Sequence, residues 1–578
     1  MKKQTLNPVF LGTIIFSGCL ILFLFLGLTD FTTKGEPREA IVAQQMIENG
    51  DWILPRNNGG EMAYKPPLFH WAVAAVSSIG GKVTEYTSRM PSAIAFLWMT
   101  CAVYMFYAKR KDEGTAFIAA LVSMTSFELY RAAISCRVDM LLTAFIVGSL
   151  LELYKWYERQ MRGIPWPAIL LMSAGTLTKG PIGSLLPCLV VGIFLLLRGV
   201  NFFKAFLSLT SFCLISFILP ALWYYLAWQR GGEEFISLVM EENIGRVTGT
   251  MSYVSHENPL WYNFLTVITG FIPWTILALL SLAAIKIKNT GSLIKRNIIS
   301  QATPVRLFTI LSIVVTFIFY CIPKSKRSVY LMPIYPFISY YIAMLIVWLG
   351  DNHKKIIKTY AAILCAIAAT LIAAIAAIKA GLISDTLVSG RHAADNIATI
   401  HAIKEVSIFP IIILLLTMVE YIKAQKNNWN RPEMSILIMT FMIYIGLYGS
   451  IIPDIMNVNS SKTFALKVEK AAPASKGTLY EFIASNVNSA GDDIHYFGIN
   501  FYLHNRIHDF YDEKPSEGFL LIPKKDMEKW LPKFQDEGYK MQKLMESEVR
   551  INKMATCLYK FSKAQASEVP PGCELPPN

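Results

Sequence analysis

Long apolar runs separated by short polar loops fill the first 452 residues of this chain. The runs lack the strict alternation of half-buried strands, so they predict helices. In the roughly 30 Å hydrocarbon core of a bilayer, only helices or closed barrels satisfy their backbone polar groups. We place thirteen spans at 9–29, 91–108, 115–127, 139–154, 166–178, 182–197, 205–228, 262–285, 307–322, 330–349, 357–378, 407–422 and 434–452. The pattern therefore predicts an all-α polytopic membrane protein.

Lysine and arginine gather in alternate loops between these spans. With the N-terminus in the cytoplasm, the basic loops all fall on the cytoplasmic side, at 109–111, 155–162, 198–204, 286–306, 354–358 and 423–431. The positive-inside rule describes this distribution. The run 9–29 is too long for the apolar region of a signal peptide and no A-x-A-like site follows, so we interpret it as an uncleaved first span. An odd number of spans then places the C-terminus outside.

Three outer segments are long, at 30–90, 230–261 and 379–406, and a polar tail covers 453–578. The tail has strand-like pieces at 495–497 and 518–522 and helical stretches at 478–487 and 525–536. Its length suits one small domain. We therefore expect a membrane domain at 1–452, with large outer loops at 30–90 and 230–261, and a periplasmic α/β domain at 453–578.

Composition agrees with a membrane protein. Of 578 residues, 54% are hydrophobic and 16% are charged, whereas soluble domains average about 25% charged residues. The net charge of +13 is explained by the basic loops, so we expect no nucleic-acid partner. The nine cysteines include no CxxC pair and no zinc spacing, and only Cys557 and Cys573 lie in the polar tail, where they could pair if the tail is periplasmic.

A few basic residues break the charge pattern because they lie on the predicted outer side. They are Arg131, Arg137, Lys179, Lys324, Lys326 and Arg327. A cation beside a span is costly unless it has a partner. Arginine offers paired donors and lysine a point charge to phosphate oxygens. A phosphate site at membrane depth is one interpretation, and contact with anionic lipid headgroups is the other.

Acidic residues at the starts of helical stretches are the next candidates. Glu36 opens a helical pattern after the first span, where an acid also interacts favourably with the helix dipole. Asp139 begins a span beside Arg137, so it either caps the helix or faces a phosphate pocket. The pair His256 and Glu257 is far from a metal-ligand set, and we favour no metal there.

Short motifs follow one another along the first part of the chain. They read GEPREA at 35–40, ENGDWILPR at 48–56, YKPPL at 64–68, RMPSA at 89–93, RVDMLL at 137–142, LTKGP at 177–181, ENIGR at 242–246, PLWY at 259–262 and KRSVYLMP at 326–333. In this order they resemble the bacterial membrane glycosyltransferases of the GT-C class. These form the protein-mannosyltransferase-like group that includes the aminoarabinose transferase of lipid A. The resemblance covers roughly the first 350 residues, and the remainder matches only in layout.

The resemblance implies the GT-C fold and an enzyme that takes a sugar from a polyprenyl-phosphate carrier, typically undecaprenyl phosphate, without a nucleotide sugar. Charge grows on the carrier phosphate as the glycosidic bond breaks, and fixed cations aimed at it lower the barrier. An acid in the first outer loop orients or deprotonates the acceptor. The implied catalytic residues are Glu36 and Asp139. The implied substrate-binding residues are Lys65, Arg38, Glu39, Arg137, Lys179, Arg246, Lys326, Arg327 and Tyr330.

Some positions depart from the family pattern. The aminoarabinose transferases usually carry Asp-Glu before the loop arginine and then Tyr, where this chain has Gly35, Glu36 and Glu39, so Glu36 acts alone or with Glu39. Some relatives hold a divalent ion with a Glu before the loop lysine and a His after a Glu in the second large loop. Tyr64 and Asn243 stand there in this chain, so we favour no metal, and the resemblance implies no other cofactor.

The sequence leaves the sugar open, and the acceptor as well, which is lipid A, another envelope glycolipid or glycan, or protein. We expect a monomer in the bacterial inner membrane, with its active site and tail on the periplasmic side. One alternative is a transporter or flippase of a lipid-linked anionic substrate, although the chain lacks an inverted-repeat pattern. Others are a protein O-glycosyltransferase of the same fold and a membrane protein without catalysis.

Overall fold

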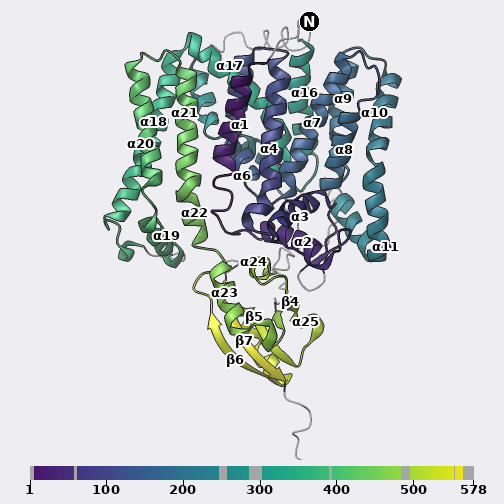
Figure 1. The fold of residues 1–578 in the computed structure, drawn as a ribbon, viewed down its shortest axis with the longest axis vertical. Coiled ribbons are helices and arrows are strands. Elements are labelled where there is room, and N and C mark those ends of the chain that lie inside the picture. The colour runs from purple at the N-terminus through teal and green to yellow at the C-terminus, as the bar shows by residue number, and fades with distance from the viewer. Residues whose placement is uncertain are drawn as a thin grey trace, which may run out of the picture. The chain divides into compact units, whose positions relative to one another are not determined.

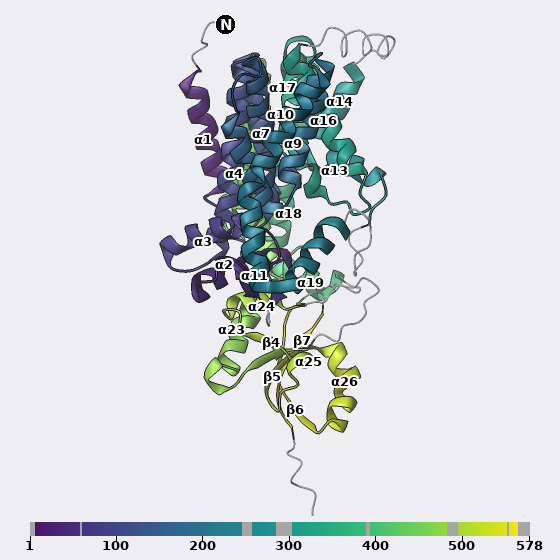
Figure 2. The same cartoon turned by 90° about the vertical axis from the view of Figure 1, so that its right-hand side faces the viewer.

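The computed structural model describes residues 6–57, 61–245, 257–284, 303–388, 393–482, 495–551 and 554–563. The chain forms two compact units, drawn together in Figure 1 and Figure 2. The first, here called the membrane unit, comprises Met1–Asp30, Val42–Pro55 and Met62–Val458. The second, here called the tail unit, comprises Phe31–Ile41, Arg56–Glu61 and Asn459–Asn578.

Helices make up nearly all of the membrane unit, and in Figure 1 most of the long ones run side by side. They are α1 (Pro8–Leu22), α2 (Gly35–Asn49, whose first residues belong to the tail unit), α3 (Leu68–Gly80), α4 (Glu85–Ala108), α5 (Glu113–Met124), α6 (Phe127–Ala133), α7 (Val138–Glu158), α8 (Trp166–Lys179), α9 (Ile182–Leu197), α10 (Phe202–Ser216), α11 (Ile218–Met240), η1 (Glu241–Gly245), α13 (Trp261–Gly270), α14 (Trp274–Ser281), α16 (Pro304–Cys321), η4 (Ser328–Ile334), α17 (Tyr335–Asn352), α18 (Lys354–Lys379), α19 (Ala393–Glu405), α20 (Phe409–Lys426), α21 (Pro432–Gly446) and α22 (Ile452–Asn457).

Several of these helices are long and apolar enough to cross a bilayer. Among the described residues there are six such helices, or up to nine spans if each of three sharply bent helix pairs is counted as one. Each of the thirteen predicted spans overlaps a helix, so the prediction of an all-α polytopic membrane protein is confirmed. The number thirteen stays a prediction, because four of the remaining apolar helices have only 10–17 residues.

Close packing of α8 against α9 fixes the turn between them. A Cβ atom on Gly183 would lie 2.2 Å from the carbonyl carbon of Gly175, so the two backbones touch where neither residue has a side chain. One residue further on in each helix, the hydroxyl groups of Thr176 and Ser184 lie 2.8 Å apart, and the Ser184 hydroxyl lies 2.8 Å from that of Ser216 of α10. The C-terminal end of α8 is therefore held in place by small and hydroxyl side chains.

Among the three sharply bent helix pairs, the segment that leads into one pair contacts the bend of another. The axes of α6 and α7 differ by 115°, and those of the helices on either side of Ile272 differ by 105°. The amide of Phe127 donates to the carbonyl of Ile272 at 3.1 Å, and the Trp274 indole donates to the hydroxyl of Thr125 at 3.0 Å. These two bonds place the residues around the start of α6 beside the α13–α14 bend.

A five-stranded mixed sheet forms the centre of the tail unit. Its strands are β3 (Leu479–Glu481), β4 (Ile507–Asp509), β5 (Glu517–Pro523), β6 (Tyr539–Glu546) and β7 (Thr556–Lys563), in the order β4-β3-β5-β7-β6. β3 runs parallel to both neighbours, whereas β7 is antiparallel to β5 and β6. The helices are α23 (Lys462–Ala471), α24 (Phe497–Tyr502), α25 (Phe510–Glu513) and α26 (Lys524–Asp536). The prediction of a small α/β C-terminal domain is confirmed.

Alternate residues of β5 serve two apolar cores. Phe519 and Leu521 pack in a cluster with residues of α23 and α24, whereas Leu520 and Ile522 pack with residues of α26. The twofold periodicity of strand side chains produces this division. The sequence predicted a strand at 518–522 and a helix at 525–536, and both predictions are confirmed.

Two local predictions in the tail were wrong. The described part of the predicted helix 478–487 is the strand β3, which has neighbours on both sides and buries all three of its residues. A strand buried on both faces lacks alternation and cannot be told from a helix by periodicity. The predicted strand at 495–497 is a loop that leads into α24, where His495 Nδ1 lies 2.5 Å from the buried carboxylate of Glu481.

Candidate functional site

Asp139 and Lys179 form the centre of a polar cluster in the membrane unit. Asp139 lies in the first turn of α7 and is buried, and Lys179 is the last residue of α8. The Lys179 ammonium donates to Asp139 Oδ1 in an ion pair. The same ammonium lies 4.7 Å from the centre of the Tyr330 ring, within the range of a cation–π contact. Three residues from three predicted motifs are thus brought together.

Two arginines add positive charge to this cluster. Arg137 immediately precedes α7 and Arg327 immediately precedes η4, and both act electrostatically on the Asp139 carboxylate. Both are half-buried. With Lys179, they give three cations that act on one carboxylate, and Arg131 of α6 also interacts electrostatically with it. Such a surplus of fixed positive charge attracts an anion, and the sequence motifs predicted this grouping.

Gly180 lets a second segment approach Lys179. Its φ of +92° is in the region that glycine adopts readily. A Cβ atom there would lie 2.8 Å from Asn243 Oδ1 of η1. The amide of Asn243 donates to the carbonyl of Val239 at 2.9 Å, which fixes its side chain against its own helix. The turn after α8 and the start of η1 therefore lie together.

The loop that carries Lys65 reaches the same end of α8. Tyr64 packs in an apolar cluster that includes Leu177, Trp223 and Tyr224. Its hydroxyl donates to Glu242 Oε1 at 3.2 Å. Because Leu177 lies two residues before Lys179, this packing brings the YKPPL motif beside the LTKGP motif. Lys65 itself is half-buried.

Lys326 has a different environment from the other cations. It is buried, and its ammonium donates to the carbonyls of Pro323 at 2.7 Å and Lys324 at 3.4 Å. The backbone carbonyl of Lys326 in turn accepts from the side-chain amide of Asn258 at 3.0 Å. These contacts stabilise the loop before η4, and the binding role of Lys326 remains a prediction from the resemblance.

The predicted acids of the first outer loop lie in the tail unit. Glu36 and Glu39 are both buried in the first turns of α2, where a carboxylate interacts favourably with the helix dipole. Arg38 Nη2 donates to Glu39 Oε1 at 3.3 Å. The acid role of Glu36 and the binding roles of Arg38 and Glu39 remain predictions from the resemblance. Arg246 falls in 246–256, outside the described residues.

The described residues do not fit a bound divalent ion. Tyr64 and Asn243, which stand at the positions that some relatives use for ligands, make the hydrogen bonds given above. Within the described ranges, no group of three His, Cys, Asp or Glu side chains could hold a metal. His256 lies outside those ranges, as does Cys573, so the pairing of Cys573 with the buried Cys557 also remains a prediction.

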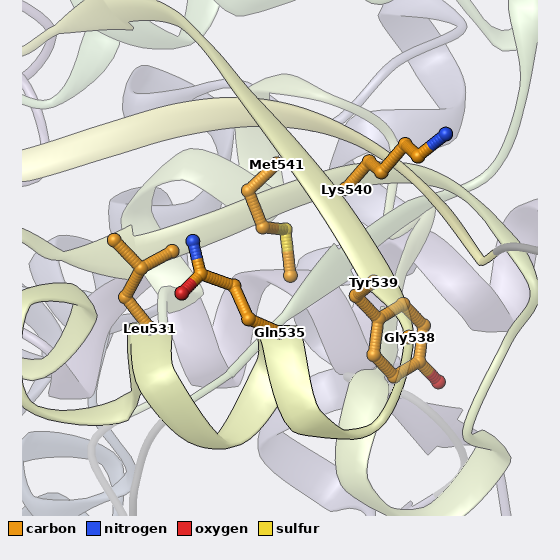
Figure 3. Close-up of a pocket in the computed structure, with 6 residues that line it drawn as sticks. All are labelled: Leu531, Gln535, Gly538, Tyr539, Lys540 and Met541. Atoms are coloured by element: carbon orange, nitrogen blue, oxygen red, sulfur yellow. The ribbon is translucent and has the colours of Figure 1, made fainter.

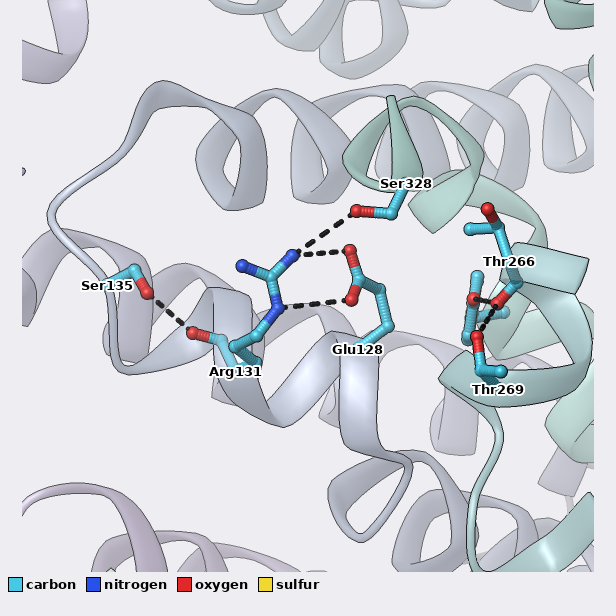
Figure 4. A network of polar contacts seen from close by, with 7 residues as sticks. Glu128, Arg131, Ser135, Thr266, Thr269 and Ser328 are labelled. Carbon is cyan, nitrogen blue, oxygen red and sulfur yellow. Dashed lines mark hydrogen bonds and ion pairs between the residues drawn. The ribbon is translucent and has the colours of Figure 1, made fainter. Parts of the chain in front are cut away.

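A second polar network lies beside the cluster, on α6. Glu128 Oε1 and Oε2 accept from Arg131 Nη2 at 2.7 Å and Nε at 3.1 Å, and Arg131 Nη2 also contacts Ser328 Oγ at 3.4 Å (Figure 4). The sequence had singled out Arg131 as an outer cation but missed Glu128. Its spacing of three residues before Arg131 on a helix is the signal that could have found it.

The tail unit has a hollow of its own. It measures about 540 Å³, lies between α26 and β6, and is lined by Leu531, Gln535, Gly538, Tyr539, Lys540 and Met541 (Figure 3). Its lining includes neither a carboxylate nor a histidine. We therefore do not consider it a candidate catalytic site.

Comparison with known proteins first defines the class. The structure matches the crystal structure of ArnT from Cupriavidus metallidurans bound to undecaprenyl phosphate with a TM-score of 0.70, over 96% of this chain and 97% of that one. At 16% sequence identity this likeness shows the fold, which is the expected GT-C fold. Residues 64–224, which include Lys65, Asp139 and Lys179, match the family model described as dolichyl-phosphate-mannose-protein mannosyltransferase.

Relatives found by sequence match only part of this chain. An uncharacterized protein of Aquifex aeolicus is 28% identical over 55% of this chain and 60% of its own length. The undecaprenyl phosphate-alpha-4-amino-4-deoxy-L-arabinose arabinosyl transferase of Shewanella sediminis is 22% identical over 63% of this chain and 64% of its own length. The match thus spans less than two thirds of each relative. In sequence and fold, this multi-pass membrane protein resembles the protein-mannosyltransferase-like and ArnT-like members of the GT-C class, as its motifs predicted.

Proposed function

We propose that this protein is a glycosyltransferase that moves a sugar from undecaprenyl phosphate, or a similar polyprenyl phosphate, to an acceptor on the periplasmic face of the bacterial inner membrane. The observation that carries the proposal is the surplus of cations near Asp139. Lys179 forms an ion pair with this carboxylate, and Arg137 and Arg327 act on it electrostatically. The shared fold with an ArnT solved with undecaprenyl phosphate supports the choice of carrier.

In the proposed reaction, the bond between the sugar's anomeric carbon and the carrier phosphate oxygen breaks, and a bond to the acceptor oxygen forms. The electron pair stays with the phosphate, whose growing charge Lys179 and Arg327 stabilise. Lys65 binds the same phosphate in this proposal, because its motif resembles that of the family. The acceptor proton passes to a base, for which Glu36 is the candidate by resemblance alone.

Asp139 takes a different role in this proposal from that of a base. Its carboxylate already accepts from Lys179 and interacts with two arginines, so it is engaged in holding cations. A carboxylate in that setting orients the ammonium of Lys179 toward the phosphate. The ring of Tyr330 contacts the same ammonium in a cation–π interaction, which restricts the position of the ammonium.

The proposed sugar is 4-amino-4-deoxy-L-arabinose and the proposed acceptor is lipid A. The arabinosyl transferases of Shewanella sediminis and Proteus mirabilis, 22% and 24% identical, support this choice. The family model, whose name specifies transfer to protein, supports a protein acceptor as the second candidate. Mass spectrometry of lipid A and envelope glycoproteins from a deletion strain distinguishes the two acceptors, because only the true acceptor should lose one defined sugar mass.

Transfer by the purified protein tests the reaction and the site. The protein is incubated with radiolabelled aminoarabinosyl undecaprenyl phosphate and lipid A, and we expect label in lipid A. Glu36→Ala and Lys65→Ala should each lower kcat/KM by at least about a hundredfold, the scale of losing an acid–base group or a fixed transition-state charge. Lys204→Ala, which changes an exposed lysine of α10, is the control and should transfer normally.

Normal transfer by Glu36→Ala or Lys65→Ala would contradict the site assignment while leaving the reaction intact. Movement of a labelled polyprenyl lipid across proteoliposomes, with no transfer of sugar, would instead favour the flippase alternative.

A further inference from the structure

The Glu128–Arg131 pair occupies a place that the proposed reaction does not explain. Glu128 is 3% exposed, and a buried carboxylate is costly unless a cation or a hydrogen-bond donor compensates its charge. Arg131 meets both carboxylate oxygens, which is the strong, direction-specific form of this interaction. The Arg131 backbone carbonyl also accepts from Ser135 Oγ at 2.7 Å (Figure 4). The guanidinium is therefore held in one orientation.

That orientation directs Arg131 to η4. Its Nη2 atom contacts Glu128 at 2.7 Å and Ser328 Oγ at 3.4 Å, so one nitrogen joins α6 to the first residue of η4. Figure 4 shows dashed contacts from the same guanidinium to Glu128 and to Ser328. η4 also packs against α7, α13 and α16, but the Ser328 contact lies at the end where the proposed phosphate-binding residues begin.

The way η4 begins explains why the contact between Arg131 and Ser328 matters for Arg327 and Tyr330. The Tyr330 amide donates to the Arg327 carbonyl at 3.1 Å, which closes a 3₁₀ turn. The Tyr330 ring lies against Lys179 and Arg327 acts electrostatically on Asp139, whereas Ser328 contacts Arg131. Arg131 thus contacts this turn through Ser328 and not through Arg327 or Tyr330, the two residues that interact with the cluster.

Glu128 is also enclosed on the side of α13 and α17. Tyr335, which follows η4, donates through its hydroxyl to the Thr266 carbonyl at 3.1 Å, and its ring stacks on Phe271 at 4.4 Å between centroids. A Cβ atom on Gly270 would lie 3.0 Å from Glu128 Cβ. Glu128 is therefore wedged between α13 and the segment that continues from η4, and it has little freedom to move away from Arg131.

We propose that Glu128 and Arg131 are positioning residues that hold η4 through Ser328, so that Arg327 and Tyr330 meet the carrier phosphate. In this proposal neither member of the pair touches phosphate or sugar, although Arg131 also interacts electrostatically with Asp139. This inference rests on the proposed function for its ligand, and on the contacts above for its mechanism. It predicts that weakening the pair changes carrier affinity without changing the acceptor site.

Two measurements on the full-length protein in detergent or nanodiscs test the proposal. The first is binding of undecaprenyl phosphate itself, by native mass spectrometry. Glu128→Gln and Arg131→Met should weaken binding by about tenfold, the scale of one charge-assisted hydrogen bond. Ser328→Ala, which removes one hydroxyl, should weaken it by about threefold. Arg131→Lys, which keeps the charge, should recover part of the affinity lost in Arg131→Met.

The second measurement is amide hydrogen exchange of residues 327–334 without any ligand. All three disrupting variants should speed exchange there relative to the wild type. The matched control is Glu420→Gln on α20, because Glu420 is also nearly buried, lies three residues before a cation, Lys423, and accepts from Ser435 at 3.0 Å. It should leave both exchange at 327–334 and carrier binding unchanged.

The outcomes separate this inference from the proposed function. If the wild type fails to bind undecaprenyl phosphate, the proposed carrier is wrong, while the exchange measurement still decides whether the pair holds η4. Unchanged exchange at 327–334 in the three variants would overturn the positioning role. So would unchanged carrier affinity in Ser328→Ala and Glu128→Gln proteins that fold normally, or an equal rise of the acceptor KM in transfer assays.

Discussion

At the scale of single residues, one ion pair explains how a lysine can stand at the end of a membrane helix. Lys179 and Asp139 each compensate the other's charge, and the side chain of Asp139 is only 10% exposed. Removing one partner of a buried pair leaves an uncompensated charge and costs about 3–5 kcal/mol. Replacing both partners by neutral groups of similar size is far less costly. Stability and catalysis should therefore respond differently to the same substitutions.

We predict that Lys179→Met lowers the unfolding free energy by about 3 kcal/mol, the lower end of that range, because Arg137 and Arg327 remain near Asp139. It should also abolish transfer. Adding Asp139→Asn should restore most of the stability but none of the activity, since the phosphate still lacks its cation. Thermal unfolding and transfer assays on the two variants check this. A double variant that regains transfer would contradict the assigned role of Lys179.

At the scale of elements, the position of Lys179 depends on how closely α8 approaches α9. Gly175 and Gly183 meet backbone to backbone, with no room for a methyl group on Gly183. A larger side chain there must separate the helices or shift the turn that follows. The motif LTKGP can hold its lysine in place only while that contact is kept.

Gly183→Val should therefore lower the melting temperature of the purified protein, with an overpacking cost of about 1–3 kcal/mol. Carrier affinity should fall as well, because the turn carrying Lys179 shifts. Gly192→Ala on the same helix α9 is the control, since a Cβ atom there meets only the Leu209 side chain, at 3.4 Å. Thermal unfolding and undecaprenyl phosphate binding measure both effects. Equal melting temperatures for the two variants would contradict the close-contact argument.

At the scale of the whole molecule, the distribution of charge predicts the side of the membrane on which each part lies. The positive-inside rule predicts that basic loops such as 354–358 lie in the cytoplasm and that the tail lies on the opposite side. The tail's sheet and helices form a folded domain with two apolar cores. A domain of that kind has to be exported in its entirety to reach the outer face.

Cysteine labelling in intact cells tests this orientation. A membrane-impermeant maleimide should label a cysteine at the exposed Gln535 of α26 but not one at the exposed Lys355, in a parent protein whose own cysteines are replaced. Both sites should label equally after the cells are lysed, which is the control for reactivity. Labelling at Lys355 and protection at Gln535 in intact cells would reverse the proposed topology, and with it the periplasmic acceptor.

The sequence by itself determined the class of the protein and most of its helices. Apolar length and charge distribution are local properties of the chain, so every predicted span overlaps a helix. The ordered motifs also indicated the GT-C class and the residues Asp139, Lys179 and Tyr330. Local periodicity failed at β3, because a strand buried on both faces has no alternating pattern to detect.

Tertiary structure alone decided which of the candidates meet and what each contributes. Lys179 and Asp139 lie 40 positions apart and pair only because α7 and α8 pack together. Lys326, though adjacent to Arg327, turns to the carbonyls of its own loop. The link from Glu128 through Arg131 to Ser328 joins distant parts of the sequence, because Arg131 and Ser328 lie 197 positions apart. Charge and spacing name the groups available for chemistry, but side-chain partners depend on which helix ends the fold brings together.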